Sequence, residues 1–363
     1  MRIAILQNRR RAGLRRIGKR ALTAAYQAAV AGEFGGVVLP EYDSFADLLD
    51  RDPIVLGTGD AIDWAALEDR ELLIWEWGWT ATPASTMLEI RKRFDIPTLM
   101  FPGPLDRFWR ELEPEDLELQ LEAASASNAI GTMLEDTVSF YRSLVPTAHV
   151  FHLPVPVDVA RFRAAALPTQ DRDRNLLLLT APTRFTGPAS QLPIATFVAF
   201  RSMLSRKPGL HGICFVYDEQ ERAGTERALR ALGLSGCVEV RSYLRPIQRY
   251  LSAVAPCWAG LALPHGLLQG RNAMTSACLG IPMVVSEEVE THRRLFPRTS
   301  VRWHDTQTAA DLCLRLLEDD GFRGAVVEEA SRCIEDYSVE KCRLRLEEGA
   351  TAAIAKHRAE SRK

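Results

Sequence analysis

Short apolar runs alternate with helical segments along the whole chain, and this alternation restricts the fold more than any other feature. In the first half the predicted strands are residues 2–6, 36–39, 53–56, 72–77, 97–101, 129–133 and 149–153. Helices are predicted between them, notably at residues 16–31, 83–94 and 135–144. Apolar runs without period-two alternation, separated by helices, are typical of a parallel sheet with both faces covered. The first half therefore predicts a doubly wound α/β domain.

A proline-rich segment interrupts the alternation near the middle of the chain. Residues 153–158 (LPVPVD) include Pro154 and Pro156, which cannot continue a helix or a central strand. A second series follows, with strands predicted at residues 175–180, 212–217, 237–241, 258–263, 283–286 and 300–303, and a long amphipathic helix at 337–359. We predict an N-terminal domain at 1–153, a hinge at 154–174, a C-terminal domain at 175–336 and a terminal helix at 337–363. The carboxyl ends of the two sheets are expected to face a ligand-binding cleft.

Composition agrees with a protein of this kind. A chain of 363 residues can bury two cores, and its contents of 47% apolar and 25% charged residues are those of an ordinary soluble protein. The seven cysteines are scattered without a CxxC pair, which predicts buried thiols in a reducing compartment such as the cytoplasm. No stretch approaches about 18 apolar residues, so no membrane span is expected.

One stretch of the second series predicts an anion site. Residues 259–286 read as a strand, a glycine-containing loop, a helix of small residues and a second strand. The loop delivers Gly270, Arg271 and Asn272 to the start of the helix. Unpaired backbone N–H groups and the positive end of the helix dipole favour an anion there, such as a diphosphate. The alternative is an ordinary crossover whose glycines serve only the turn.

Four segments, in matching order, resemble one known family. Residues 150–162 (VFHLPVPVDVARF) resemble the "φPNGVD…F" hinge of GT-B-fold glycosyltransferases, and residues 270–285 (GRNAMTSACLGIPMVV) resemble their "EAxAxGxPVV" donor helix and strand. Residues 175–199 fall where that family has its "vGRxxxxKG" loop, and residues 337–346 resemble its terminal helix, which crosses back to the first domain. The similarity is to the group 1 members, which use nucleotide sugars and mostly retain anomeric configuration.

The resemblance implies a nucleotide-sugar co-substrate held by the second domain, without a cofactor or a metal. The donor-site residues it implies are Arg184, Gly187, Tyr243, His265, Gly266, Gly270, Arg271, Asn272 and Thr275. Arg184 and Arg271 would neutralise the leaving diphosphate. The two glutamates that are usual in the family are replaced by Thr275 and Leu267, so recognition of the ribose or the sugar must differ.

Two carboxylates are candidates for catalysis on the acceptor side. Asp60 follows a predicted strand in a glycine turn, and Glu76 lies among Trp75, Trp77 and Trp79. Either could act as a general base, and the tryptophans could stack on a sugar. Alternatively, Asp60 caps a helix, the tryptophans are core and Glu76 is salt-bridged.

The sequence leaves the acceptor open. It could be a glycan, a small molecule or DNA, the last contacted by the basic cluster Arg9, Arg10, Arg11, Arg15 and Arg16. That cluster could equally be a solvated helix face. The sequence also leaves open that the chain is not an enzyme but a degenerate relative, which keeps the fold and only binds or scaffolds. The two missing glutamates favour this alternative. The DxD patterns Asp50-Arg51-Asp52 and Asp171-Arg172-Asp173 are attributed to chance.

Overall fold

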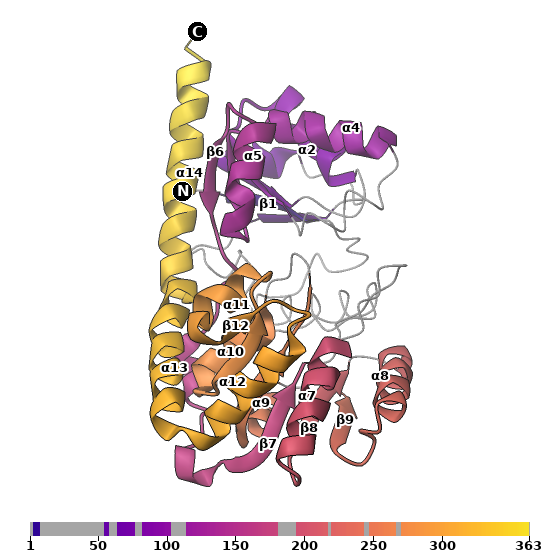
Figure 1. Cartoon of the computed structure of the whole chain (residues 1–363). Helices are drawn as coiled ribbons and strands as arrows, with labels where there is room; N and C mark the ends of the chain where they lie inside the picture. Colours follow the sequence, from indigo (N-terminus) through magenta and orange to yellow (C-terminus); the bar gives the residue numbers. More distant parts are fainter. Residues whose placement is uncertain are drawn as a thin grey trace. The chain divides into compact units, whose positions relative to one another are not determined.

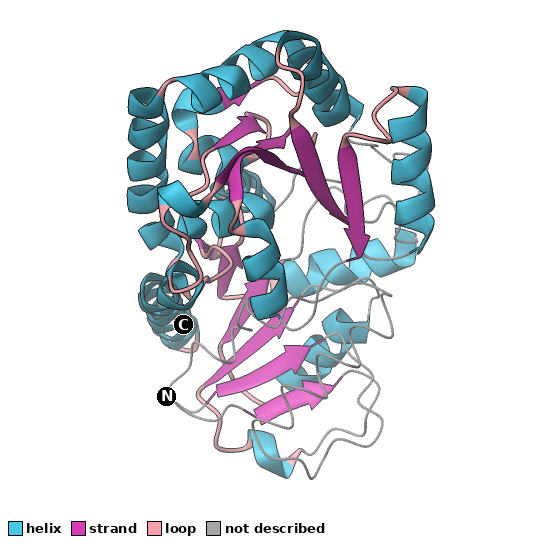
Figure 2. Cartoon of the chain, turned by 90° about the horizontal axis from the view of Figure 1, so that it is seen from below, coloured by secondary structure: helices cyan, strands magenta, loops and turns pink. Residues whose placement is uncertain are grey.

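The computed structural model describes residues 3–7, 54–57, 64–76, 82–102, 114–180, 194–216, 219–242, 247–265 and 270–362. Two compact units divide these residues. The first unit takes the described residues up to Pro156 and those from Tyr337 onward, and the second takes Val157–Asp336. In each unit, helices surround the strands of one sheet (Figure 2).

The first unit contains a parallel sheet of six described strands in the order β2-β1-β3-β4-β5-β6. The strands are β1 (Ile3–Gln7), β2 (Ile54–Gly57), β3 (Leu72–Glu76), β4 (Thr98–Phe101), β5 (Ala129–Thr132) and β6 (His149–His152). The helical segments are η2 (Ala65–Leu67), α2 (Thr82–Arg93), α4 (Pro114–Ser125), η3 (Glu135–Thr137), α5 (Val138–Leu144), η6 (Ile334–Tyr337) and α14 (Val339–Glu360). The short helix η6 crosses the division between the units, because its last residue, Tyr337, is the first residue of the segment that returns to the first unit.

Both faces of this sheet are buried, which explains its continuous apolar runs. Alternate side chains such as Leu73 and Met100 form one core with α2, α4 and α5. Their neighbours Leu72 and Leu99 form a second core with Leu346 and other residues of α14. The terminal helix therefore covers the face opposite α2, α4 and α5, and Figure 1 shows it running alongside β6.

Trp75 belongs to the first of these cores. Its side chain is fully buried, and its Nε1 donates a hydrogen bond to Ser127 Oγ at 3.0 Å. The interpretation of Trp75 as part of a sugar-stacking platform is therefore wrong, because no face of the indole is open to a ligand. The alternative, a core tryptophan, is confirmed.

The second unit contains a parallel sheet in the order β12-β11-β10-β7-β8-β9. The strands are β7 (Asp173–Leu179), β8 (His211–Val216), β9 (Val238–Ser242), β10 (Cys257–Ala262), β11 (Met283–Ser286) and β12 (Ser300–Val301). The helical segments are α6 (Val159–Arg163), η4 (Thr169–Asp171), α7 (Ile194–Arg206), α8 (Glu219–Ala231), α9 (Ile247–Val254), α10 (Arg271–Leu279), α11 (Glu290–Leu295), η5 (Pro297–Thr299), α12 (Thr306–Glu318) and α13 (Asp320–Cys333). Counted from β7, the strand order is that of a Rossmann fold, 3-2-1-4-5-6.

The segment expected to be a hinge contains regular structure. Asp158 caps α6 by accepting a hydrogen bond from Arg161 N at 3.0 Å, and β7 already begins at Asp173. The division between the units falls between Pro156 and Val157, immediately after the second proline. Asp171 and Asp173 therefore lie in η4 and β7, within the second unit.

All seven cysteine thiols are free, and five of them are buried. Burial raises the pKa of Cys214, Cys257, Cys278, Cys313 and Cys342 to about 12. Among the helices that the structure describes, none combines the length and apolar character needed to span a membrane.

Candidate functional site

The strand order of the second sheet reverses between β7 and β10, which are hydrogen-bonded neighbours. Ligands of open α/β sheets bind outside the carboxyl ends of the strands at such a reversal. The helices that follow these two strands, α7 and α10, both begin at this edge. Thr196 in the first turn of α7 accepts a hydrogen bond from Leu263 N at 3.0 Å, which ties α7 to the end of β10. The carboxyl edge of β7 and β10 is therefore the candidate site.

Gly270 precedes α10 in a conformation that favours glycine. Its φ of 63° and ψ of 30° lie in the left-handed region. A Cβ atom built on Gly270 would lie 2.9 Å from His292 Cδ2 and 2.9 Å from Thr291 Cβ, so the backbone angle favours glycine and the space excludes a larger residue. Glycine has no side chain with which to cap the helix, and no side chain of Gly270 therefore competes with a ligand for the N-terminus of α10.

Arg271 and Asn272 stand at the first two positions of α10 and are partly exposed. The hydroxyl of Tyr250, a buried residue of α9, donates to Asn272 Oδ1 at 3.5 Å. This contact turns the amide NH2 group of Asn272 away from Tyr250. A guanidinium and an amide donor thus flank the start of α10, as the sequence predicted for an anion site.

Thr275 stands where the resemblance expects a ribose-binding glutamate. The residue is only 2% exposed, and its neighbour Ser276 is fully buried. Thr275 thus lies on the buried side of α10, one turn below its start. A hydrogen bond from its hydroxyl to a ribose remains a prediction.

His292 lies directly behind the Gly270 turn. It is 3% exposed, and burial lowers its pKa to about 3 although it hydrogen-bonds the backbone of Ser286. The imidazole is therefore neutral throughout the physiological range. It fills the space beside Gly270 and links that turn to the end of β11.

The depressed pKa of His292 predicts a pH dependence of stability. Below the unfolded pKa of about 6.5, the unfolded chain binds a proton that the folded chain does not bind until the pH approaches about 3. Stability should therefore fall as the pH falls, and between pH 7 and pH 5 this group should account for a loss of about 2 kcal/mol. Urea unfolding of the wild type and of His292→Gln at both pH values measures it. Equal losses in the two proteins would contradict the assignment.

A second group of side chains lies at the same edge, beyond β10. The exposed ring of His265 packs edge-on against Trp303, which follows β12, with centroids 5.5 Å apart. Trp303 N donates to Glu288 Oε2 at 3.2 Å, and Glu288 follows β11. Of these residues, His265 was predicted from the sequence, whereas Glu288 and Trp303 were not. Glu288 could have been predicted, because Asp60 was chosen as a candidate for the same reason: it is a carboxylate that follows a predicted strand.

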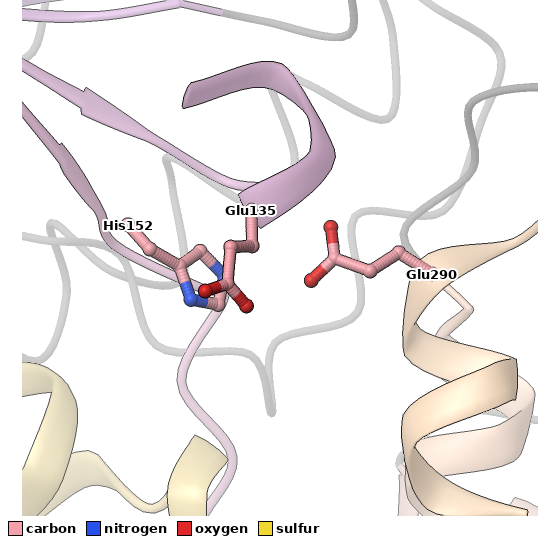
Figure 3. A group of neighbouring side chains, drawn as sticks. All are labelled: Glu135, His152 and Glu290. Carbon is pink, nitrogen blue, oxygen red and sulfur yellow. The ribbon is translucent and has the colours of Figure 1, made fainter. Parts of the chain in front are cut away.

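The first sheet also has polar groups at its carboxyl edge. Glu76 ends β3, which neighbours β1 at the reversal of strand order, although its side chain lies outside the described part of the chain. Glu135 begins η3 after β5, and His152 ends β6; Figure 3 shows the Glu135 carboxylate beside the His152 ring. Polar atoms of the two side chains lie within 4.8 Å of each other. This histidine–carboxylate pair was not predicted from the sequence.

Glu290, also drawn in Figure 3, belongs to the second unit, where its carboxylate pairs with Arg294 Nε at 3.2 Å. Within either unit taken alone, the described residues form no group of three metal-ligating side chains.

The remaining predicted site residues lie outside the described residues: Asp60, Arg184, Gly187, Tyr243, Gly266 and Leu267, together with the arginine cluster Arg9, Arg10, Arg11, Arg15 and Arg16.

Comparison with known proteins places the fold. No protein-family model and no curated protein sequence matches the chain. Solved structures do match. The UDP-forming α,α-trehalose-phosphate synthase from Burkholderia xenovorans is 15% identical, with a TM-score of 0.60 over 93% of this chain and 80% of that one. The α,α-trehalose 6-phosphate synthase from Burkholderia multivorans is 14% identical, with a TM-score of 0.64 over 99% of both chains.

HepE from Anabaena, solved in complex with UDP and glucose, is 9% identical, with a TM-score of 0.63 over 97% of this chain and 100% of that one. These structures are glycosyltransferases of GT-B fold, and the likeness extends over both units. The predicted architecture of two doubly wound, Rossmann-like domains is therefore confirmed. At these identities the likeness establishes the fold alone.

Proposed function

We propose that this chain, which has the GT-B fold, is a glycosyltransferase that moves a sugar from a nucleotide-sugar donor to an acceptor hydroxyl. The observation that carries the proposal is the start of α10: a left-handed glycine, an arginine and an asparagine at the strand reversal of a Rossmann sheet. Helix N-termini at such reversals bind the diphosphate of nucleotides. The trehalose-phosphate synthase from B. xenovorans is UDP-forming and HepE was solved with UDP, which favours a uridine donor.

In the proposed reaction, the bond between the anomeric carbon and the diphosphate oxygen breaks, and the diphosphate leaves with the electron pair. The acceptor oxygen bonds to the anomeric carbon and gives its proton to a base. The N–H groups of α10 and the guanidiniums of Arg271 and Arg184 would stabilise the charge on the leaving diphosphate, so no metal is needed for that role. The base would come from the first unit, where Glu135–His152 now joins Asp60 and Glu76 as a candidate.

Calorimetric titration of the full chain with UDP, in the presence of EDTA, tests the donor site. We expect UDP to bind, and Arg271→Ala to weaken binding by about tenfold or more through loss of a charge-assisted contact. Arg230→Ala is the matched control, because Arg230 lies in the last turn of α8, at the opposite edge of the sheet. If no nucleoside diphosphate binds, or if the two variants behave alike, the proposal fails.

A second candidate is a protein that binds a nucleotide sugar without transferring it. It is favoured by one observation, namely that Thr275 replaces the expected carboxylate and is buried. Release of UDP from UDP-glucose, followed with and without added saccharide acceptors, separates the two candidates. Turnover abolished by His152→Gln or Glu76→Gln, with UDP affinity unchanged, would establish transfer, whereas UDP-glucose binding without any turnover would favour the binding protein.

A further inference from the structure

We propose that Trp303 and Glu288 form a saccharide subsite at the carboxyl edge of the second sheet. In it, the exposed part of the Trp303 indole would pack against the C–H face of a pyranose ring, while the Glu288 carboxylate would accept hydrogen bonds from the ring hydroxyls. The inference deepens the proposed function and rests on it, since a glycosyltransferase must hold a sugar beside its diphosphate site.

The indole is held in place but not covered. The imidazole rings of His265 and His304 each lie with their centroids 5.5 Å from that of the indole, at interplanar angles of 70° and 86°. The backbone N–H of Trp303 is fixed by Glu288 at 3.2 Å. Even so, 36% of Trp303 remains exposed. A large, immobilised aromatic surface loses little conformational entropy when a flat ligand stacks on it.

The carboxylate of Glu288 is oriented and has acceptor capacity left. Trp303 N approaches its two oxygens at 3.2 and 3.5 Å, and the Ser286 hydroxyl donates to Oε2. Among the described residues no cation pairs with it, because Arg302 pairs with the adjacent Glu287 at 3.6 Å. A carboxylate has about four lone-pair positions, so the Glu288 carboxylate can still accept hydrogen bonds from sugar hydroxyls.

The subsite adjoins the proposed diphosphate site through the sheet. His265 follows β10, Glu288 follows β11 and Trp303 follows β12, three consecutive strands of one parallel sheet. Their carboxyl ends share the edge at which α10 begins, between β10 and β11. In a nucleotide sugar the pyranose is bonded directly to the diphosphate. A surface that binds the pyranose must therefore lie at the same edge of the sheet as the diphosphate site.

The pyranose could come from the donor or from a saccharide acceptor, and two measurements distinguish these sources. Calorimetry compares the affinities of UDP and UDP-glucose. Ligand-observed NMR follows methyl α-glucoside, with and without saturating UDP. Each is made on the full-length wild type and on Trp303→Ala, Trp303→Phe and Glu288→Gln. Phe140→Ala is the matched control, since Phe140 is an exposed aromatic residue (41%) in the first unit.

We expect Trp303→Ala to weaken binding of one pyranose source by about tenfold, Trp303→Phe to weaken it less, and Glu288→Gln to weaken it by about fivefold. UDP binding and the melting temperature should change little in all three, and Phe140→Ala should behave as wild type. A selective loss for UDP-glucose assigns the donor sugar, and a selective loss for the glucoside assigns an acceptor.

If all variants bind both pyranose sources as the wild type does while UDP still binds, the subsite is refuted and the proposed function stands. If the wild type binds neither UDP nor UDP-glucose, the proposed function fails. The subsite is then tested with methyl α-glucoside alone. It is refuted if the wild type gives no NMR binding signal, or if Trp303→Ala gives the same signal as the wild type.

Discussion

Replacing Gly270 by alanine should destabilise the second unit by about 3 kcal/mol and abolish nucleotide binding. The left-handed backbone costs an alanine about 1 to 2 kcal/mol. Its Cβ would in addition meet the His292 ring and Thr291 Cβ, each at 2.9 Å. Both neighbours are buried in α11, so relief must come from movement of the turn that precedes α10. Such movement displaces the N–H groups proposed to hold the diphosphate, which makes affinity more sensitive than stability. Urea unfolding and UDP titration measure the two effects.

Gly280→Ala is the matched control for this prediction. Gly280 ends the same helix with a φ of 68°, close to the 63° of Gly270. Its Cβ would meet nothing nearer than Arg172 Nη2 at 3.6 Å, which is an ordinary contact. Gly280→Ala should therefore lower the free energy of unfolding only by the backbone strain, about 1 to 2 kcal/mol, and leave the affinity for UDP intact. Equal loss of UDP binding in both variants would mean that the helix as a whole, and not its start, controls the site.

Much of the fold could be predicted because both of its sheets are buried on two faces. Runs such as Met283–Ser286 are apolar at nearly every position, so each run marks a strand directly. The prolines at 154 and 156, which predicted a hinge at residues 154–174, directly precede the division between the two units at Val157. What could not be predicted was α6, since five residues capped by Asp158 have no period long enough to recognise before the fold is known.

The candidate site was only partly predictable, and the limit was sequence separation. Gly270, Arg271 and Asn272 are adjacent in the chain, so a local pattern identified them. His265, Glu288 and Trp303 follow three different strands, and the strand order alone makes them neighbours. Trp75 shows a different limit. Three tryptophans within five residues were compatible with either a surface platform or a core, and only the helices packed on this sheet show that Trp75 lies in the core.

A second substitution with a large expected effect concerns the terminal helix. Gly349 lies in the middle of α14, where glycine costs about 1 kcal/mol relative to alanine. Its Cβ would lie 2.0 Å from Phe151 Cζ and 2.3 Å from Cε1, so the β6 side chain occupies the place of a methyl group. Gly349→Ala should therefore destabilise the first unit by about 2 kcal/mol net, because steric displacement of α14 outweighs the gain in helix propensity. Urea unfolding followed by circular dichroism measures the change.

Two further variants separate the steric effect from helix propensity. Gly324→Ala lies within α13, where an added Cβ meets nothing within 4 Å, so this exposed substitution should stabilise the chain by up to about 1 kcal/mol. In a Phe151→Ala background, the ring that blocks position 349 is gone, and Gly349→Ala should become neutral or stabilising. This coupling identifies the Phe151 ring as the reason for glycine in the helix. If Gly349→Ala is as destabilising without the ring as with it, α14 does not pack on β6 through this contact, and the burial of the second face of the first sheet must be explained by other residues.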